Sequence, residues 1–398
     1  MTGLTTEFDP LFRTVGELDR QYLDLWREIA MIESPTDCKA GVDAVTDVLA
    51  DVAQKRGWKV ERKPMEIAGD VLCVTLNPDA KAAPLVLSGH IDTVHPIGSF
   101  GSPAVRIENG KIYGPGVCDC KGGVVAALLA MDALDRGGYR SRPVMLLTQS
   151  DEETNSRQSD KATIRSICEK AKNAAAFLNL EPQIRPGYAC IVRKGIVEYR
   201  FTVTGIAAHS SMVATNGANA IAEAAHKILE IERYKDADGI TCCCGLIEGG
   251  TASNAVPDRC TFTVNIRYAT AEQREWIEKR MREIAGETRI KGCWTELTLL
   301  THRIAMEYTD RNRDLLDRMN RAFSACGLPT LKPGSSKGGS DAADVTAYGI
   351  PCVDSLGVSG GKIHSRGEFA EIASLAEAAK RVVAVALGLD ADDEQKTE

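Results

Sequence analysis

Four short apolar runs, each ending in polar or acidic residues, most strongly constrain the fold of this chain. Stretches with helical character, such as 124–136 and 159–172, separate them. Strands that alternate with helices favour an open, largely parallel α/β sheet, in which ligands bind beyond the carboxyl ends of the strands. The polar residues fall at those ends. The four runs are PLVLSGHID (84–92), PVMLLTQSDEE (143–153), AAAFLNLEP (174–182) and IPCVDSLG (350–357).

Between about residues 195 and 306 the pattern changes to a βαββαβ order, which is the ferredoxin-like motif. TAEQ (270–273) is a capping box that opens the second of its helices. We expect this motif to be a domain inserted into the α/β domain, because strand 350–357 must rejoin the first sheet. The predicted divisions are a first catalytic part (1–194), a lid and dimerisation domain (195–306) and a second catalytic part (307–398). The expected elements of the insertion are strand 195–205, helix 219–234, strands 239–247 and 259–268, helix 271–286 and strand 294–303.

The length and charge of the chain restrict its function. A chain of 398 residues is long enough for two domains, and a net charge of −7 argues against a nucleic-acid surface or a basic membrane patch. No apolar run approaches the ~18 residues of a membrane span, and the N-terminus carries acids rather than a signal-peptide core. We therefore expect a cytoplasmic protein. Only the acidic tail, 390–398, is expected to be disordered.

The thirteen cysteines include no CxxC pair. Buried thiols in a reducing compartment explain them better than disulfides or a zinc–thiolate site. The run at 242–244 alternates faces along a strand, so its members cannot all meet one partner. Cys118 and Cys120 are likewise interpreted as packing residues.

The acids and histidines at the strand ends are the residues that could carry chemistry. Taken singly, each has a structural explanation, such as a helix N-cap or a solvated turn. Their convergence on one sheet edge instead indicates a metal site, and His with carboxylate ligands suits zinc, with manganese or cobalt as alternatives. A carboxylate two residues from a histidine can also accept its second N–H and fix the tautomer. The residues are His90, Asp92, Asp119, Glu152, Glu153, Glu181 and His364.

Two divalent cations would also explain the crowded acids of TQSDEETNS (148–156), because they offset the mutual repulsion of the carboxylates. Of the neighbouring glutamates, one can bind a metal while the other holds a metal-activated water. Such a water is a nucleophile at neutral pH. Glu152 would take its proton and return it to the leaving amine.

The motifs SGHIDTV, GPGVCDCKGG, SDEE, LEP and the closing stretch from GGSDAADV to HSRGEF resemble the di-zinc metallopeptidases of the aminoacylase, acetylornithine deacetylase and carboxypeptidase G superfamily. The resemblance runs from about residue 20 to 388 and keeps the motif order. LEP, NIRYA, GGSDAA and DSLG are most similar to the carboxypeptidase G type of glutamate carboxypeptidase. After SDEE this chain has TNSRQSDK, where the family usually has a short segment containing glycine.

The resemblance implies a set of metal ligands. His90, Asp119 and Glu181 would bind one cation, and Asp119 would bridge to a second that Glu153 and His364 complete. The implied cofactor is two zinc ions per subunit, with Mn²⁺ or Co²⁺ as alternatives. Glutamate at position 181, where aminopeptidase-like relatives tend to carry aspartate, favours carboxypeptidases and deacylases.

The resemblance also implies catalytic and substrate-binding residues outside the ligand set. Glu152 matches the general base, and Asp92 matches the residue that orients the first histidine. His209 matches a lid histidine that reaches the partner subunit's active site and steadies the oxyanion. The residues that match a site for the substrate's carboxylate end are Asn254, Arg267 and Gly360.

Structural alternatives stay open for several of these residues. His209 could cap the turn after its strand, and Arg267 could form a surface ion pair instead of using its planar fork on a carboxylate. Arg303 could serve either purpose, and His226 is interpreted as structural. No role is assigned to Asp151, His95 or His302.

The sequence thus predicts an α/β zinc-peptidase-like domain with an inserted ferredoxin-like lid. We expect a homodimeric, zinc-dependent amide hydrolase that acts beside a free carboxylate of a small peptide or N-acyl amino acid. A glutamate-carboxypeptidase-like activity is the first hypothesis, and an N-acyl-amino-acid deacylase of the acetylornithine or succinyl-diaminopimelate type is the second. A non-catalytic metal-binding relative is a third, which predicts a broken ligand set.

Overall fold

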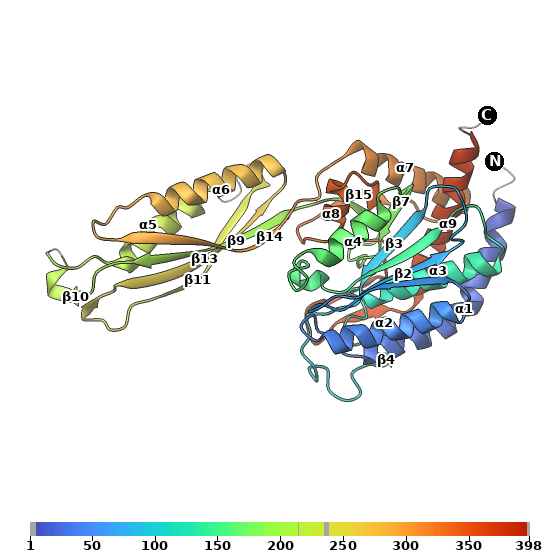
Figure 1. The fold of residues 1–398 in the computed structure, drawn as a ribbon, viewed down its shortest axis with the longest axis horizontal. Helices are drawn as coiled ribbons and strands as arrows, with labels where there is room; N and C mark the ends of the chain where they lie inside the picture. Colours follow the sequence, from blue (N-terminus) through green and yellow to red (C-terminus); the bar gives the residue numbers. More distant parts are fainter. Residues whose placement is uncertain (1–4, 214, 235–238, 396–398) are drawn as a thin grey trace. The chain divides into compact units, whose positions relative to one another are not determined.

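The computed structural model describes residues 5–213, 215–234 and 239–395, and its chain divides into two compact units (Figure 1). The α/β unit comprises Met1–Ile191, Tyr308–Ser335 and Ser340–Glu398. The inserted unit comprises Val192–Glu307 and Ser336–Gly339. The chain therefore leaves the first unit at Val192 and again, for four residues, at Ser336, and it returns each time.

A mixed six-stranded sheet forms the centre of the α/β unit, in the order β1-β2-β6-β3-β7-β16. β3 pairs in parallel with β6 and β7, and β7 in parallel with β16. The edge β1–β2 and the pair β2–β6 are antiparallel. β2, β3, β6 and β7 are buried at every position, so helices cover both faces of this sheet. The strands are β1 (Lys59–Lys63), β2 (Val71–Leu76), β3 (Leu85–His90), β6 (Val144–Gln149), β7 (Ala176–Asn179) and β16 (Cys352–Val353).

The helix that follows the Gly-rich loop, α3, is the most deeply placed helix of the unit. Its residues 121–134 are all buried, which agrees with its nearly continuous apolar sequence. It packs against β3 and β6 and is covered by α1 and α9. The helices are α1 (Thr5–Met31), α2 (Lys39–Gln54), α3 (Lys121–Arg136), α4 (Ala162–Ala171), α7 (Asp310–Ala325), α8 (Ala342–Ala347) and α9 (Ala373–Gln395).

Two smaller sheets complete the strands outside the ferredoxin-like motif. One has the order β17-β18-β5-β4 and joins segments about 250 residues apart in the sequence, because β18 pairs with β5. The other is the pair β15–β8. Their bounds are β4 (Arg106–Glu108), β5 (Lys111–Tyr113), β8 (Tyr188–Arg193), β15 (Lys332–Ser336), β17 (Gly360–Gly361) and β18 (Phe369–Glu371).

The inserted unit has the predicted ferredoxin-like topology. Its antiparallel sheet has the order β11-β13-β9-β14, and α5 and α6 pack against it. Stacked rings of Phe201 and Phe262, with centroids 4.7 Å apart, lie in its core. Thr270 accepts a hydrogen bond from the N–H of Gln273, as the capping box predicts. The elements are β9 (Gly195–Thr204), β10 (Ala208–His209), α5 (Ala220–Glu232), β11 (Thr241–Gly249), β12 (Ala255–Val256), β13 (Arg259–Tyr268), α6 (Ala271–Gly286) and β14 (Trp294–Arg303).

The expectation of a disordered acidic tail is wrong for residues 390–395, because α9 continues through them. The buried guanidinium of Arg142 binds Asp390 and Asp393, at 2.7 and 2.9 Å, and Arg318 binds Asp392 at 2.5 Å. These ion pairs offset the acidity that the sequence presents at this end. Residues 396–398 of the same expectation lie outside the described residues.

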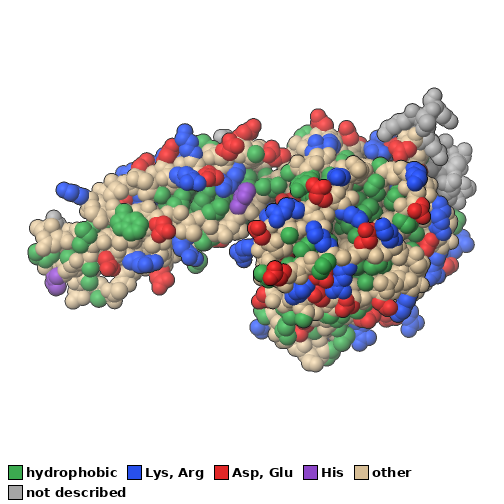
Figure 2. Space-filling model, viewed as in Figure 1, with side chains coloured by type: hydrophobic (Ala, Val, Ile, Leu, Met, Phe, Trp, Pro, Cys, Tyr) green, Lys and Arg blue, Asp and Glu red, His purple; other side chains and the backbone are tan. Residues whose placement is uncertain are grey.

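No helix in the described part of the chain is long and apolar enough to cross a membrane. On the face of the α/β unit drawn in Figure 2, acidic and basic side chains are interspersed and form no field of one sign. The thirteen cysteines are free thiols, and eight of them are buried, as expected of packing residues, whereas Cys243 is exposed.

Candidate metal centre

The carboxyl ends of three neighbouring strands bring the predicted side chains together. His90 is the last residue of β3, Glu152 and Glu153 begin a 3₁₀ turn after β6, and Glu181 follows β7. Because β3 lies between β6 and β7 in parallel register, these three ends share one edge of the sheet. Asp119, just before α3, and His364, just before β18, join the cluster from outside the sheet.

The carboxylate of Asp119 lies between the two histidines. Its Oδ1 is 3.0 Å from Nε2 of His90, and its Oδ2 is 3.3 Å from Nε2 of His364. The same nitrogen of His364 lies 3.3 Å from Oε2 of Glu153. One carboxylate therefore presents a separate oxygen to each of two nitrogen donors.

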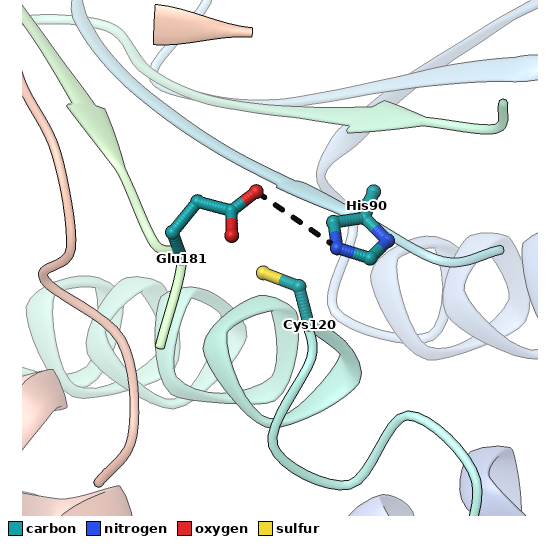
Figure 3. A group of neighbouring side chains, drawn as sticks. All are labelled: His90, Cys120 and Glu181. Atoms are coloured by element: carbon teal, nitrogen blue, oxygen red, sulfur yellow. Dashed lines mark ion pairs between the residues drawn. The ribbon is translucent and has the colours of Figure 1, made fainter. Parts of the chain in front are cut away.

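On the other side of His90, its Nε2 lies 3.8 Å from Oε1 of Glu181 (Figure 3). The thiol of Cys120 lies beside this pair, and ligand atoms of all three residues fall within 4.8 Å of one another. That thiol donates to the carbonyl of Leu180 at 3.0 Å, and burial raises the pKa of Cys120 well above its usual value. Cys120 is therefore held as a neutral thiol, as expected of a packing residue.

Gly123, one of the two glycines that close the GPGVCDCKGG motif, allows α3 to approach the end of β7 closely. A Cβ on Gly123 would lie 2.0 Å from the carbonyl oxygen of Leu180, and one on Gly122 would lie 2.6 Å from that of Val117. Any larger residue would push the helix away from the strand. Gly123 thus sets the spacing between Asp119, just before the helix, and Glu181, just after the strand, and Gly122 lets the helix pack against the loop that precedes it.

The carboxyl and imidazole groups of the cluster shift one another's pKa values. Burial raises the pKa of Glu153 to about 7, the bond to His364 opposes the shift, and the charge of Asp119 adds to it. Hydrogen bonds to Asp119 and Glu153 raise the pKa of His364 to about 10. Burial also raises the pKa of Asp119, but bonds from both histidines outweigh it and hold that pKa below its ordinary value. The carboxylates of Asp119 and Glu153 therefore stabilise a positive charge placed between them.

Asp92 organises the loop that carries the two glutamates. Its buried carboxylate accepts the N–H groups of Glu152 and Glu153, at 3.2 and 3.1 Å, and the hydroxyl of Thr36 at 2.7 Å. Nδ1 of His90 lies 3.0 Å from the main-chain oxygen of Asp92 and 3.4 Å from its carboxylate. The sequence predicted the contact with the histidine, and the structure adds the larger role at the loop.

Asp151 is a structural acid. It is fully buried, and its carboxylate accepts the hydroxyl of Thr163 at 2.6 Å and the N–H of Ser159 at 2.9 Å. These bonds close the TNSRQSDK segment, in which four non-glycine residues have positive φ angles between 49° and 65°. Backbone of this kind favours glycine, so the segment keeps a glycine-like conformation without glycine. The four residues are Asn155, Ser156, Asp160 and Lys161.

Glu368 is a residue of this centre that the sequence did not reveal. Its side chain is 1% exposed, and its Oε1 accepts the N–H groups of Cys118 and Asp119 at 2.9 and 3.0 Å. Its Oε2 lies 2.7 Å from Nε2 of His95, to which the sequence assigned no role. Residues separated by about 250 positions thus hold the backbone of Asp119, and no local pattern could have shown that pairing.

The predicted catalytic and substrate-binding residues of the inserted unit are distributed over its loops and strand ends. His209 is exposed, and its Nδ1 accepts the N–H of Ser211 at 3.3 Å, so it does cap the turn after its strand. Nε2 of this ring makes no hydrogen bond to any residue that the structure describes. The main-chain oxygen of Asn254 accepts the N–H of Ser210 at 2.9 Å.

The guanidinium of Arg267 donates to the side chain of Asn265 and to the carbonyl of Lys337, both at 3.1 Å. Both acceptors are neutral, and the guanidinium forms no ion pair with a residue in the described ranges; burial lowers the pKa of Arg267, and the charge of Glu198 opposes that shift. Gly360, in the α/β unit, is fixed by packing, because a Cβ there would lie 2.1 Å from the carbonyl oxygen of Phe369.

Three further residues of the inserted unit were considered in the sequence. His302 lies 2.9 Å from the hydroxyl of Tyr268, and His226 is exposed on α5. Arg303 is buried, and its side chain packs against Gly339. None of the three belongs to the cluster around Asp119.

The donors of the cluster fit divalent cations. Histidine nitrogens and carboxylate oxygens bind zinc at about 2.0–2.2 Å, which places the ligand atoms of one tetrahedral ion roughly 3.4 Å apart. The observed separations among the nitrogens and oxygens, 3.0–3.8 Å, are of that size. His90, Asp119 and Glu181 would hold one ion, and Asp119, Glu153 and His364 a second.

A cluster of histidines and carboxylates at the carboxyl ends of the strands of an α/β sheet is the kind of site that metal-dependent hydrolases use. The chain belongs to peptidase family M20/M25/M40, whose family model matches residues 86–388.

Two curated relatives cover most of the chain. Carboxypeptidase G2 from Pseudomonas sp. strain RS-16 is 26% identical over 371 residues, which are 92% of this chain and 88% of that protein. Succinyl-diaminopimelate desuccinylase from Rhodospirillum centenum is 27% identical over 373 residues, 89% of this chain and 93% of that protein. The two relatives are hydrolases with different substrates.

Solved structures show the same fold at lower identity. Aminopeptidase PepT from Bacillus cereus has a TM-score of 0.77 and 22% identity, with 94% of this chain and 99% of that chain covered. An M20 metallo-carboxypeptidase from Sulfolobus solfataricus has a TM-score of 0.70 and 19% identity, with 93% and 99% covered.

Proposed function

We propose that this protein is a two-zinc amide hydrolase that removes a C-terminal amino acid from a small peptide, as a glutamate carboxypeptidase does. One observation carries the proposal: the two oxygens of the buried Asp119 carboxylate each face a different histidine, at 3.0 and 3.3 Å. A single structural ion needs no such bridging group. The intact ligand set and the presence of Glu152 also argue against a non-catalytic relative.

Bound zinc would supply a Lewis acid for the amide carbonyl and lower the pKa of a water enough to make it a nucleophile at neutral pH. Side chains of the protein would transfer the protons and orient the metal ligands. Glu152 is buried, and its main-chain N–H donates a hydrogen bond to the carboxylate of Asp92. The carboxylate of Glu152 can therefore take the proton of the attacking water and return it to the leaving amine. The bonds to His90 fix which of its nitrogens faces the cation.

The second candidate is an N-acyl-amino-acid deacylase, which the similarity to a desuccinylase over 89% of the chain favours. Both reactions break an amide bond beside a carboxylate and need the same metal centre. They differ only in the groups that flank the scissile bond.

A substrate panel tests the proposal directly. The zinc- and manganese-loaded enzyme would be assayed with C-terminal glutamate peptides, folate-like conjugates, dipeptides, and N-acetyl and N-succinyl amino acids. Hydrolysis should be abolished by a chelator and by Glu152→Gln, which keeps the shape of the side chain and leaves bound metal unchanged. Glu66→Gln, an exposed glutamate, is the matched control. Turnover that survives in Glu152→Gln at the wild-type rate would refute the assigned base.

We further propose that the protein is a homodimer in which His209 serves the active site of the partner subunit. The support is that its Nε2 is not engaged by any described residue, although its Nδ1 is fixed by the turn. Glu152→Gln and His209→Ala would each be inactive alone. Mixed and reassociated, they should recover about a quarter of wild-type activity, because half of the dimers are mixed and each has one intact site. If mixed dimers form but no activity is recovered, His209 does not serve the active site of the partner subunit.

A further inference from the structure

A hollow of about 590 Å³ lies in the α/β unit beside the metal centre. Residues 94–99, which follow β3, form one wall, and residues 364–366 form the other. All of its lining belongs to one unit. Ligand sites are typically concave, with apolar walls and a few polar groups that fix orientation.

The hollow is joined to the metal centre through His364. Nε2 of this residue faces Asp119 and Glu153 at 3.3 Å each, and the residue also lines the hollow. A substrate whose carbonyl lies at the cation next to His364 can therefore extend a substituent into this space. Val94 and Ile97, which are 40% and 63% exposed, give the opposite wall an apolar surface.

The charge in this hollow is positive. The exposed guanidinium of Arg366 lines it and makes no ion pair or hydrogen bond with any residue in the described ranges. None of the residues that line it is acidic, and His95 is already paired with Glu368. On the neighbouring loop, Glu33 accepts the N–H of Gly98 at 2.8 Å and does not line the hollow.

We propose that Arg366 is a specificity-determining residue that binds a second carboxylate of the substrate. A guanidinium recognises a carboxylate through two parallel N–H donors, and Val94 and Ile97 would cover the methylene groups leading to it. The inference rests on the proposed amide hydrolase and names its substrate class. That class is amides in which a short methylene chain separates the scissile bond from an additional carboxylate, on the amino-acid side or on the acyl side.

Paired substrates test this assignment. One pair is a blocked dipeptide ending in glutamate and its glutamine counterpart, and the other is an N-succinyl amino acid and its N-butanoyl counterpart. The wild-type enzyme should favour the acidic member of at least one pair. Arg366→Gln should raise KM for that member about tenfold or more, which corresponds to one lost charge-assisted contact, and leave kcat and the neutral member unchanged. Arg366→Lys should recover part of the affinity, and Arg20→Gln, an exposed arginine on α1, is the control.

The outcomes separate the two sides of the substrate. An effect on the glutamate pair places the amino-acid side chain in the hollow, and an effect on the succinyl pair places the acyl group there. Equal turnover of acidic and neutral members by the wild type would overturn the proposal. So would equal losses for both members in Arg366→Gln, because they would show a role in folding rather than recognition.

Binding measured by calorimetry gives a readout that does not depend on turnover. Zinc-loaded protein should bind glutarate more tightly than butyrate, and Arg366→Gln should remove the difference. If nothing in either pair is hydrolysed but glutarate binding still depends on Arg366, the amide-hydrolase proposal fails and this one stands. If glutarate and butyrate bind equally to the wild type, the assignment of Arg366 is wrong.

Discussion

Replacement of Glu368 by alanine should destabilise the loop that carries Asp119. The side chain is 1% exposed and accepts the N–H groups of Cys118 and Asp119. Each buried donor left without an acceptor costs about 1–3 kcal/mol. Two donors give roughly 2–6 kcal/mol, and water entering the space left by the side chain can satisfy one of them. We therefore expect the free energy of unfolding of the α/β unit to fall by about 2–4 kcal/mol.

The assay is thermal or urea denaturation with a chelator present, so that bound metal does not contribute to the apparent stability. Glu368→Gln keeps an oxygen that can accept both N–H groups and should cost no more than about 1.5 kcal/mol. Glu371→Ala is the matched control three residues along the chain, because Glu371 is half-exposed in its ion pair with Lys111. That change should stay within about 0.5 kcal/mol.

Glu368→Ala should also weaken zinc binding by about 10–100-fold, the usual effect of removing a group that orients a ligand. Isothermal titration of each variant with zinc measures this. Unfolding free energy within 1 kcal/mol of wild type, together with unchanged zinc affinity, would refute the reasoning.

Three other substitutions test separate parts of the structure by denaturation. Asp151→Ala should cost about 2–3 kcal/mol, because the buried hydroxyl of Thr163 on α4 and the partly buried N–H of Ser159 lose their acceptor; an unchanged midpoint would show that the loop does not depend on it. Phe262→Ala should cost the inserted unit about 3–5 kcal/mol through the cavity it leaves, and a loss below 1 kcal/mol would contradict tight packing there. Asp390→Ala should cost about 2 kcal/mol because it leaves the buried Arg142 without one of its carboxylates, whereas Arg142→Met should cost less; the reverse order would contradict this account.

The sheet and most of the centre could be predicted because parallel strands end at a common edge. That rule alone places His90, Glu153 and Glu181 near one another, although together they span about 90 residues of the sequence. In the inserted unit, hydrophobic periodicity and the capping box gave the bounds of helix 271–286 and strands 259–268 and 294–303 as the structure has them. These signals are local and strong.

Other features depend on contacts that no local pattern contains. The antiparallel edge strand β1 is highly charged and has no buried residue, so KVERK lacks the pattern of a strand. The pairing of His95 with Glu368 joins positions 273 residues apart. Order in the acidic segment 390–395 follows from cations on other elements, Arg142 and Arg318, which composition cannot place beside it.

The most direct test of the carboxylate-bridged centre is a crystal structure of zinc-loaded protein with anomalous data collected at the zinc edge. We expect two anomalous peaks about 3.5–4 Å apart, one on each side of the Asp119 carboxylate. The first should contact His90 and Glu181, and the second Glu153 and His364. A single peak, or two peaks that do not share Asp119, would contradict the proposed two-metal site.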